Sequence, residues 1–367
     1  MFAILAAKAA VFLLVFLAFR LLPFFADQYQ LNFVDPAYEQ SSLAAAFGTW
    51  DAQHYLFLAE HGYQPGNESN AFFPLLPALI RAAMPIVGGS SLVAGLVVSN
   101  LASLAGLYLL FVFLRDLYGR RTATDTLILF LAMPTAFFFS LVYSEAIFLL
   151  LSALFFIFLY RNQYARAALP AALLPLARPA GALVLLPLVA YYLANERPAV
   201  SRRAVWLAAP IAGCGIYLGV MWLATGNPLE MMQAEKVYVS GYSLLNVLHP
   251  DQLWQQLMRG PLAIHGYTDS MIDRAFFAAF LVLLIPMFRR LPLPLALFAL
   301  GAGVLSVLSG TFMSYPRYLL AAFPLFLAVA LLLQHRQVRW LQPPLLFLFT
   351  MLQGLFLVMH ALSYWVA

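Results

Sequence analysis

The sequence predicts an all-α protein that crosses a membrane many times, and its composition and patterning both support this. Hydrophobic residues make up 64% of the 367 residues, charged residues only 10%, and the mean hydropathy is +0.86. Soluble domains carry about 25% charged residues, so an ordinary soluble domain is excluded. The apolar residues gather in long runs, and a helix needs about 20 of them to cross the hydrocarbon core.

We expect about eleven transmembrane helices. The first run is not followed by a small-residue cleavage site and a polar domain, so we expect a retained helix and not a signal peptide. The expected helices cover residues 5–24, 92–114, 124–140, 143–160, 167–177, 180–194, 204–223, 275–288, 293–309, 318–333 and 343–362.

The basic residues predict the orientation of these helices, because short cytoplasmic loops carry an excess of lysine and arginine. With the N-terminus inside, the loops that face the cytoplasm hold only three acidic residues, Asp116, Asp125 and Glu196, and the other acidic residues are external. The same loops hold Arg115, Arg120, Arg121, Arg161, Arg166, Arg197, Arg202, Arg203, Arg289, Arg290, Arg336 and Arg339.

Two apolar stretches need separate treatment under this topology. If residues 71–87 crossed the membrane, Arg115 would lie outside, so we expect this proline-broken run to be interfacial or re-entrant. Residues 167–194 begin and end beside cytoplasmic arginines. We therefore expect two short helices there that meet externally at Arg178 and Pro179, because proline ends or kinks a helix.

The expected domain is a single one over residues 1–367, with two large external loops at 26–91 and 225–274 that carry interfacial helices. Long loops usually carry function, so we expect the chemistry to face outward. The net charge of +5 does not indicate nucleic acid, because the basic residues are scattered over short loops. A single cysteine excludes an internal disulfide.

Four segments bring polar residues to the external side. In WDAQHYLFLAEHG, Asp51, His54, Tyr55 and Leu58 follow helical spacing, with Gly62 as a C-cap. An interfacial helix with Asp51 favoured by the helix dipole is the structural alternative. In PTAFFFSLVYSEAIFLL, residues 134–150, the acid beside Tyr143 is Glu145, and a Ser144 cap on the next helix is the alternative.

The other two segments each carry an arginine. Arg178 in LLPLARPAGALVLLPL lies at a proline break, and its planar guanidinium is suited to bind phosphate. The alternative is that its side chain extends to the membrane–water interface. Arg317 in GTFMSYPRYLL precedes Tyr318 at a helix start, and an interface anchor is the alternative. Histidines 54, 61, 249, 265, 335 and 360 lack zinc-motif spacing, so we expect neither a metal site nor another cofactor.

These segments resemble, in order, the hallmark segments of the PIG-V (GPI mannosyltransferase II) family within the GT-C glycosyltransferase superfamily. The matching blocks are WDAQHYLFLAEHGY with AFFPLLPALIR, then PTAFFFSLVYSEAIF, then ARPAG, and finally SYPRYLLAAFPLF. The resemblance implies a GT-C-type fold. It also implies inverting transfer of a mannosyl group from a polyprenyl-phosphate sugar to an acceptor hydroxyl on a glycolipid or glycan. The chain is short for the eukaryotic enzymes, and its composition suits a bacterial member, with the site on the external face of the plasma membrane.

The resemblance also implies roles for individual residues. Asp51 is the expected general base, with Glu145 as the alternative base and His54 as a group that orients Asp51 or contacts substrate. Arg178 and Arg317 are expected to hold the lipid phosphate. The other expected substrate contacts are Trp50, Tyr55, Tyr143, Ser144 and Tyr318.

Two alternative functions stay open on the sequence alone. A transporter or lipid flippase also places polar residues and proline-broken helices in the membrane. The same fold with another lipid-linked sugar is the second alternative. Membrane lipids surround the chain in each case, and no residue pattern identifies a protein partner.

Overall fold

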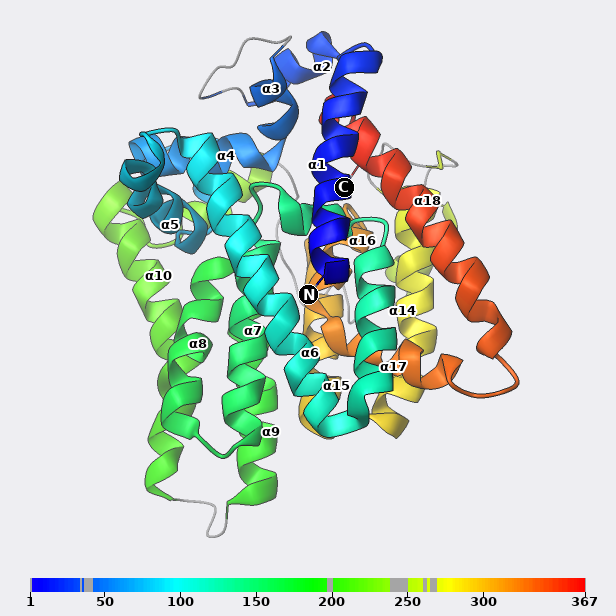
Figure 1. Cartoon of the computed structure of the whole chain (residues 1–367). Helices are drawn as coiled ribbons and strands as arrows, with labels where there is room; N and C mark the ends of the chain where they lie inside the picture. The colour runs from blue at the N-terminus through cyan, green and yellow to red at the C-terminus, as the bar shows by residue number, and fades with distance from the viewer. Residues whose placement is uncertain are drawn as a thin grey trace.

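The computed structural model describes residues 2–33, 35, 42–196, 201–237, 250–259, 263–264 and 269–366, and the regular elements in these ranges are all helical. Figure 1 shows the helices running mostly along one direction, with a few short ones at the upper end. The α-helices are α1 Phe2–Leu21, α2 Ala26–Leu31, α3 Leu43–Phe47, α4 Asp51–His61, α5 Leu75–Ala83, α6 Ser91–Ala132, α7 Glu145–Tyr160, α8 Tyr164–Ala177, α9 Leu185–Asn195, α10 Ala209–Thr225, α11 Glu230–Ala234, α13 Pro250–Arg259, α14 Met271–Arg290, α15 Leu293–Leu305, α16 Tyr315–Tyr318, α17 Phe323–Leu333 and α18 Gln342–Ala361.

Five helices among the described residues are long and apolar enough to cross a membrane, and a bent helix pair makes a sixth span if its two parts are counted together. The pair joins Tyr315–Ala321 to Phe323–Leu333 through a bend of 89°. The described residues also form five shorter apolar helices: Leu75–Val87, Glu145–Tyr160, Tyr164–Ala177, Pro179–Asn195 and Leu293–Ser309. The chain is thus an all-α multi-pass membrane protein.

The expected helices correspond to observed ones, with three differences in detail. The ranges 92–114 and 124–140 are one element, α6, which reverses at Gly119, where φ is 82°. The second arm ends at Ala132, before a 3-10 turn over Ala136–Ser140, because proline at 134 cannot continue a helix. The range 318–333 contains the sharp bend of the sixth span.

Close packing of α7 against its neighbours forms much of the core. At Gly106 in α6, an added Cβ atom would lie 2.9 Å from the backbone nitrogen of Leu150 in α7, so only glycine allows this approach. Small residues bring membrane helices together in this way, because dispersion contacts between backbones replace the hydrophobic driving force. The buried face of α7 is rich in phenylalanine, including Phe148, Phe155 and Phe156.

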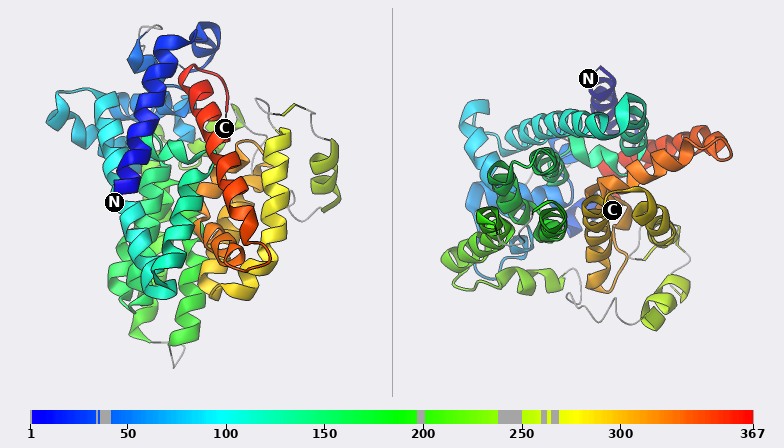
Figure 2. Two further views of the ribbon diagram at one scale, coloured as in Figure 1. Left: turned by 45° about the vertical axis from the view of Figure 1, so that its right-hand side comes forward. Right: turned by 90° about the horizontal axis from the view of Figure 1, so that it is seen from below.

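Two groups of helices meet around the centre of the molecule. Seen from below, α7 to α10 lie on one side and α14 to α18 on the other (Figure 2). The short helix α4 crosses the upper end, whereas the turn between α7 and α8 and the reversal of α6 lie at the lower end (Figure 1). Helix α4 carries Asp51, His54 and Tyr55, three of the polar residues predicted from the sequence.

Candidate functional site

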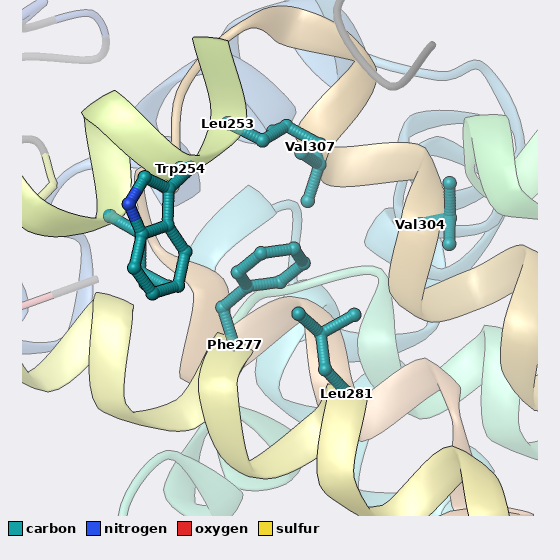
Figure 3. Close-up of a pocket in the computed structure, with 7 residues that line it drawn as sticks. Leu253, Trp254, Phe277, Leu281, Val304 and Val307 are labelled. Carbon is teal, nitrogen blue, oxygen red and sulfur yellow. The ribbon is translucent and has the colours of Figure 1, made fainter. Parts of the chain in front are cut away.

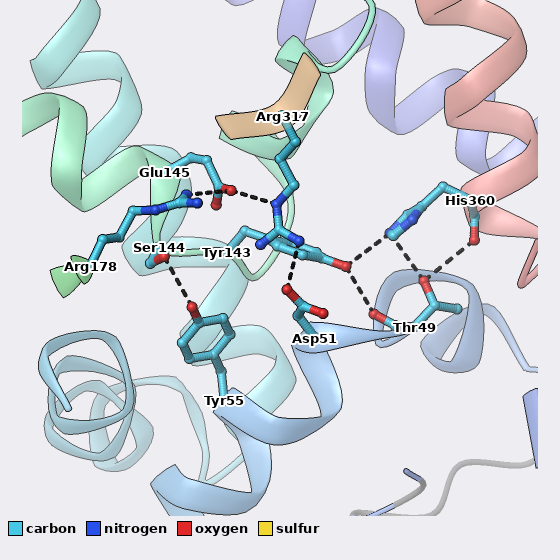
Figure 4. A network of polar contacts seen from close by, with 9 residues as sticks. All are labelled: Thr49, Asp51, Tyr55, Tyr143, Ser144, Glu145, Arg178, Arg317 and His360. Atoms are coloured by element: carbon cyan, nitrogen blue, oxygen red, sulfur yellow. Dashed lines mark hydrogen bonds and ion pairs between the residues drawn. The ribbon is translucent and has the colours of Figure 1, made fainter. Parts of the chain in front are cut away.

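Arg317 lies in α16, just before the bend of the helix pair, and occupies the centre of a buried polar cluster. Its short helix α16 follows Ser314, whose φ of 58° turns the chain. The Nε group donates to Oε1 of Glu145 over 2.6 Å, and Nη1 donates to Oδ2 of Asp51 over 2.6 Å. One guanidinium therefore joins the start of α4 to the start of α7 (Figure 4).

Arg178 completes the cluster from a second break in a helix. It lies between α8 and the 3-10 turn Pro179–Val184, and its extended backbone (φ −159°) separates the two. Its Nη1 group lies 2.5 Å from the same Oε1 atom of Glu145 that accepts from Arg317. Asp51, Glu145, Arg178 and Arg317 are called the arginine–carboxylate cluster below.

The four charged groups of the arginine–carboxylate cluster differ in exposure. The side chain of Glu145 is 1% exposed and those of Arg178 and Arg317 are 7% and 6% exposed, whereas that of Asp51 is 25% exposed. Two cations and two anions balance formally, which makes their burial tolerable. The interface alternative for Arg178 and Arg317 is therefore wrong. Asp51 is the cluster member that solvent or a substrate reaches most easily.

Aromatic rings support both guanidinium groups. The Cζ atom of Arg317 lies 4.6 Å from the ring centroid of Tyr143 and 4.9 Å from that of Phe138. The Cζ atom of Arg178 lies 5.4 Å from the ring centroid of Tyr318. Such cation–π contacts contribute about 2 kcal/mol when desolvated, so the rings help to fix the planes of both arginines.

The segment before Asp51 has an unusual backbone. Helix α4 begins at Asp51, as predicted, and ends at Gly62, which has a φ of 76°. The preceding Trp50 has φ 56° and ψ −132°, which is rare for a residue with a side chain. Its ring packs edge-on against Trp365 at 5.0 Å, and its buried Nε1 group has no hydrogen-bond partner among the described atoms.

Tyr55 and Ser144 connect α4 to the start of α7. The Tyr55 hydroxyl donates to Oγ of Ser144 over 3.0 Å. Ser144 precedes α7, but its side chain makes no capping hydrogen bond, so the cap predicted as its structural role is wrong. Burial raises the pKa values of Tyr55 and Tyr143, mainly through desolvation, so both phenols stay protonated and act as donors.

His54 lies in a stack of aromatic rings on α4. The rings of Phe33 and Phe72 each pack at 4.4 Å from the imidazole, and Nδ1 lies 2.9 Å from Oγ of Ser69. Desolvation by burial lowers its pKa to about 4, although the charge of Asp51 acts in the opposite direction. The imidazole is therefore neutral near pH 7 and is fixed between the rings of Phe33 and Phe72.

Two contact residues of this site were not predicted as site residues. Thr49 Oγ1 lies 3.1 Å from Nε2 of His360, and the Tyr143 hydroxyl donates to the Thr49 carbonyl oxygen over 3.3 Å. His360 comes from α18, far away in the sequence, so no local spacing indicates it. The only sequence feature that indicates Thr49 as a site residue is its position directly before the WDAQHY segment.

No group of three histidine, cysteine, aspartate or glutamate side chains is arranged to hold a metal ion within the part of the chain that the structure describes. Two of the six histidines, His249 and His265, lie outside the described residues. The second predicted external loop, 225–274, is described only over 225–237, 250–259, 263–264 and 269–274.

One small cavity adjoins the arginine–carboxylate cluster and is lined by Arg178 and Tyr318 together with Leu305 and Ser306. A separate apolar cavity of about 300 Å³ lies between α13, α14 and the end of α15 (Figure 3). Its lining residues are Leu253, Trp254, Leu257, Phe277, Leu281, Val304 and Val307. A second apolar cavity, of about 500 Å³, includes Leu319, Phe326 and Val329.

The chain is similar to known proteins in sequence and in fold. The model of the mannosyltransferase (PIG-V) family matches residues 11–183, which contain Asp51, Glu145 and Arg178 but not Arg317. The resemblance in the sequence motifs is thereby confirmed. In a sequence search of curated proteins, nothing matches this chain.

Two solved structures share the fold. ArnT from Cupriavidus metallidurans, bound to undecaprenyl phosphate, aligns with a TM-score of 0.54 and 15% identity over 92% of this chain and 62% of its own. The Archaeoglobus fulgidus oligosaccharyltransferase, in complex with zinc and sulfate, aligns with a TM-score of 0.51 and 15% identity over 98% of this chain. This chain spans 53% of that protein. The fold is of the GT-C type, as predicted.

Proposed function

Because residues 11–183 belong to the mannosyltransferase (PIG-V) family, we propose that the protein transfers a mannosyl group from a polyprenyl-phosphate sugar to an acceptor hydroxyl. The acceptor oxygen forms a bond to the anomeric carbon as the bond from that carbon to the phosphate oxygen breaks, with inversion. The acceptor proton passes to a base, and polyprenyl phosphate leaves as the anion. The observation that carries the proposal is the arrangement of Arg178 and Arg317 around two carboxylates.

The arginines are suited to the leaving phosphate. A guanidinium has five N–H donors, and the ion pair of Arg178 with Glu145 uses Nη1. Its remaining donors are available to a phosphate oxygen, and planar donor pairs bind phosphate well. A similarly folded protein binds undecaprenyl phosphate, which supports a lipid-linked donor here. Cationic groups placed where negative charge develops stabilise the transition state.

Asp51 is the better candidate for the base. Its side chain is 25% exposed, so an acceptor hydroxyl has access to it. Glu145 is 1% exposed, and its Oε1 atom already accepts from both arginines. A general base must come within hydrogen-bond reach of the proton it removes. We assign Glu145 to holding the arginines in place and Asp51 to proton removal.

The sugar is expected to lie beside Asp51 and the start of α7. Tyr55, Tyr143 and Ser144 surround this position with hydroxyl groups, and Trp50 offers an aromatic face. Tyr318 fixes Arg178 through its ring. His54 acts on this site through α4, because its ring lies in the Phe33 and Phe72 stack.

The polyprenyl tail is proposed to occupy the apolar cavity of Figure 3. Val304 and Val307 line this cavity, and Leu305 and Ser306, which lie between them in the sequence, line the small cavity beside Arg178. Val304→Phe, which fills this cavity, is expected to raise the KM for the lipid donor about 10-fold. Val329→Phe, in the second apolar cavity, is the matched control. A larger effect of Val329→Phe would assign the tail to the second cavity.

We further propose that the site faces the external side of the plasma membrane. Two arginine-bearing segments, the α7 to α8 turn and the Gly119 reversal, lie at the lower end of the molecule, and α4 lies across the upper end (Figure 1). This separation supports the orientation inferred from charge. Modification of a single introduced cysteine by a membrane-impermeant reagent in intact cells tests it. Asn67→Cys is expected to react, and Asn162→Cys is expected to react only after lysis.

The direct test is turnover by the purified protein. With polyprenyl-phosphate mannose and a set of glycolipid and glycan acceptors, the wild type is expected to release polyprenyl phosphate. Chelation is expected to leave this activity unchanged, because the arginines supply the positive charge. Release from other lipid-linked sugars but not from mannose would keep the reaction and change the donor. Ion-coupled solute uptake into proteoliposomes, without release, would contradict the enzyme and indicate a transporter.

A further inference from the structure

Residues 360–365, which follow and end α18, contact the two residues that directly precede Asp51. His360 Nε2 lies 3.1 Å from Oγ1 of Thr49, and that hydroxyl also approaches the His360 carbonyl oxygen at 3.4 Å. The ring of Trp365 packs edge-on against Trp50 at 5.0 Å. His360 and Trp365, which make these two contacts, lie outside residues 11–183, the part that matches the family model.

His360 also contacts the rings that support Arg317. Its ring centroid lies 5.8 Å from that of Tyr143 and 5.2 Å from that of Phe138, and Nε2 lies 3.5 Å from the Tyr143 hydroxyl. These are the two rings under the Arg317 guanidinium. The His360 imidazole thus contacts Thr49, which lies two residues before Asp51, and also the two rings that pack against Arg317. It therefore lies next to groups that hold both partners of the Asp51–Arg317 ion pair (Figure 4).

The hydrogen-bond pattern favours one tautomer of His360. The Thr49 hydroxyl has a single proton, which it donates to the His360 carbonyl oxygen. Nε2 then carries the ring proton and donates to Thr49 Oγ1, while the buried Nδ1 atom is the acceptor without a partner among the described atoms. The opposite tautomer would bury an N–H group without an acceptor, which is the costlier arrangement.

The backbone at Trp50 needs such support. A residue other than glycine with φ 56° and ψ −132° is strained, and strained residues persist only where their surroundings hold them. His360 contacts Thr49 and Trp365 packs against Trp50, and the Gln53 side chain donates to the carbonyl oxygen of the preceding Gly48. The strained residue directly precedes Asp51, whose carboxylate pairs with Arg317.

We propose that His360, assisted by Trp365, is a positioning residue that sets the place of the Asp51 carboxylate relative to Arg317. This inference rests on the proposed function of Asp51 as the base. An error of about 1 Å in the position of a catalytic group reduces turnover by about 100-fold. The residue does not touch the reacting atoms in this account, so it should affect kcat more than donor affinity.

The test compares purified His360→Ala, His360→Gln and His335→Ala. His335 is an exposed histidine bonded to Arg290 and serves as the matched control. We expect His360→Ala to lower kcat by about 10- to 100-fold, with the KM for polyprenyl-phosphate mannose changed less than about threefold. Glutamine places an N–H donor near the position of Nε2, so His360→Gln should recover most of the loss. His335→Ala should match the wild type.

Two results overturn the proposal. One is wild-type kcat in His360→Ala. The other is a rise in KM as large as the fall in kcat, which His360→Gln does not correct. That result would indicate a general packing role. Amide hydrogen exchange over residues 49–55 is measured on the same samples and does not depend on the sugar donor. Faster exchange is expected in His360→Ala alone. Unchanged exchange overturns the positioning role, whereas absent turnover in the wild type overturns the proposed function instead.

Discussion

Two buried polar clusters join distant segments of this chain, and they differ in how their carboxylates are used. In the first, the Glu230 cluster, Oε1 of Glu230 accepts from the Gly66 backbone over 2.7 Å and from Asn70 over 3.4 Å, and Oε2 accepts from Asn227 over 3.1 Å. Neutral donors thus occupy both oxygens of one carboxylate. This is the pattern of a structural connection between loops.

The arginine–carboxylate cluster has a different character. Glu145 has one oxygen without a partner among the described atoms, and Asp51 is one-quarter exposed. Arg178 and Arg317 are charged groups with more donors than Glu145 and Asp51 use. The unused donors of these arginines lie beside an accessible carboxylate and are available to a substrate, whereas both oxygens of Glu230 already accept from neutral donors.

The largest effect is expected from Asp51→Asn. The amide keeps the size of the side chain but cannot accept a proton, so turnover should fall by about 10²- to 10⁴-fold, the usual contribution of a general base. Asp116→Asn, an exposed change that removes an ion pair with Arg115, is the control and should leave kcat unchanged. Steady-state kinetics with a lipid donor measures both. Equal kcat values would remove Asp51 from the chemistry.

Arg317→Ala tests the charge balance of the arginine–carboxylate cluster. The change leaves Asp51 and Glu145 without their shared partner, and removing one partner of a buried pair costs about 3–5 kcal/mol. Thermal unfolding in detergent should therefore shift strongly downward. Replacing Arg203, which pairs with Glu196 near the protein surface, should cost below about 1 kcal/mol. Similar costs for the two arginines would mean that burial adds nothing at Arg317.

His54 connects the two clusters, because its partner Ser69 is the neighbour of Asn70. Burial holds its pKa near 4, against 6.5 for the free side chain, so only the unfolded state gains a proton between these values. Stability is therefore complete above pH 6.5 and falls by up to about 3 kcal/mol as the pH drops toward 4. Urea unfolding of His54→Gln should show a shallower decline. His61→Gln, an exposed control, should keep the wild-type profile.

Arg178→Ala separates donor binding from the rest of the site. A charged hydrogen bond contributes about 1.5–3 kcal/mol, so the KM for the lipid donor should rise about 10- to 100-fold. Arg166→Ala, in an exposed part of α8, is the control. An unchanged apparent affinity in Arg178→Ala would place the phosphate elsewhere.

The smallest effect on turnover is expected at the Glu230 cluster. Glu230→Gln turns one acceptor into a donor that faces the Asn227 amide, so unfolding should become easier by about 1–3 kcal/mol. The kcat should stay within about twofold of the wild type. A loss of turnover as large as that of Asp51→Asn would erase the distinction between the two clusters.

The sequence predicted the helices well, because apolar run length and charge asymmetry are properties of the chain itself. It predicted a reversal between the ranges 92–114 and 124–140, but not that the two arms are one element that turns at Gly119. It did not predict the 89° bend after Ala321. The motifs named Asp51, Glu145, Arg178 and Arg317 as candidates, and the structure brings these four side chains together. The alternative in which the two arginines only extend to the interface does not fit their burial.

The pairing of the polar residues is what the sequence lacked. Asp51 and Arg317 are separated by 266 positions, and nothing local states that they touch. The roles of Thr49 and His360 were hidden for the same reason, because their contact joins residues 311 positions apart. Tertiary packing, and not spacing, assembles this site.

A single-turnover experiment distinguishes Asp51 as the base from Glu145 as the group that holds the arginines. Excess wild-type, Asp51→Asn or Glu145→Gln protein is mixed with labelled polyprenyl-phosphate mannose and acceptor, and bound donor and released polyprenyl phosphate are followed in the same samples. We expect Asp51→Asn to bind the donor as the wild type does but to release almost no polyprenyl phosphate. Release by Asp51→Asn at the wild-type rate would contradict this role of Asp51.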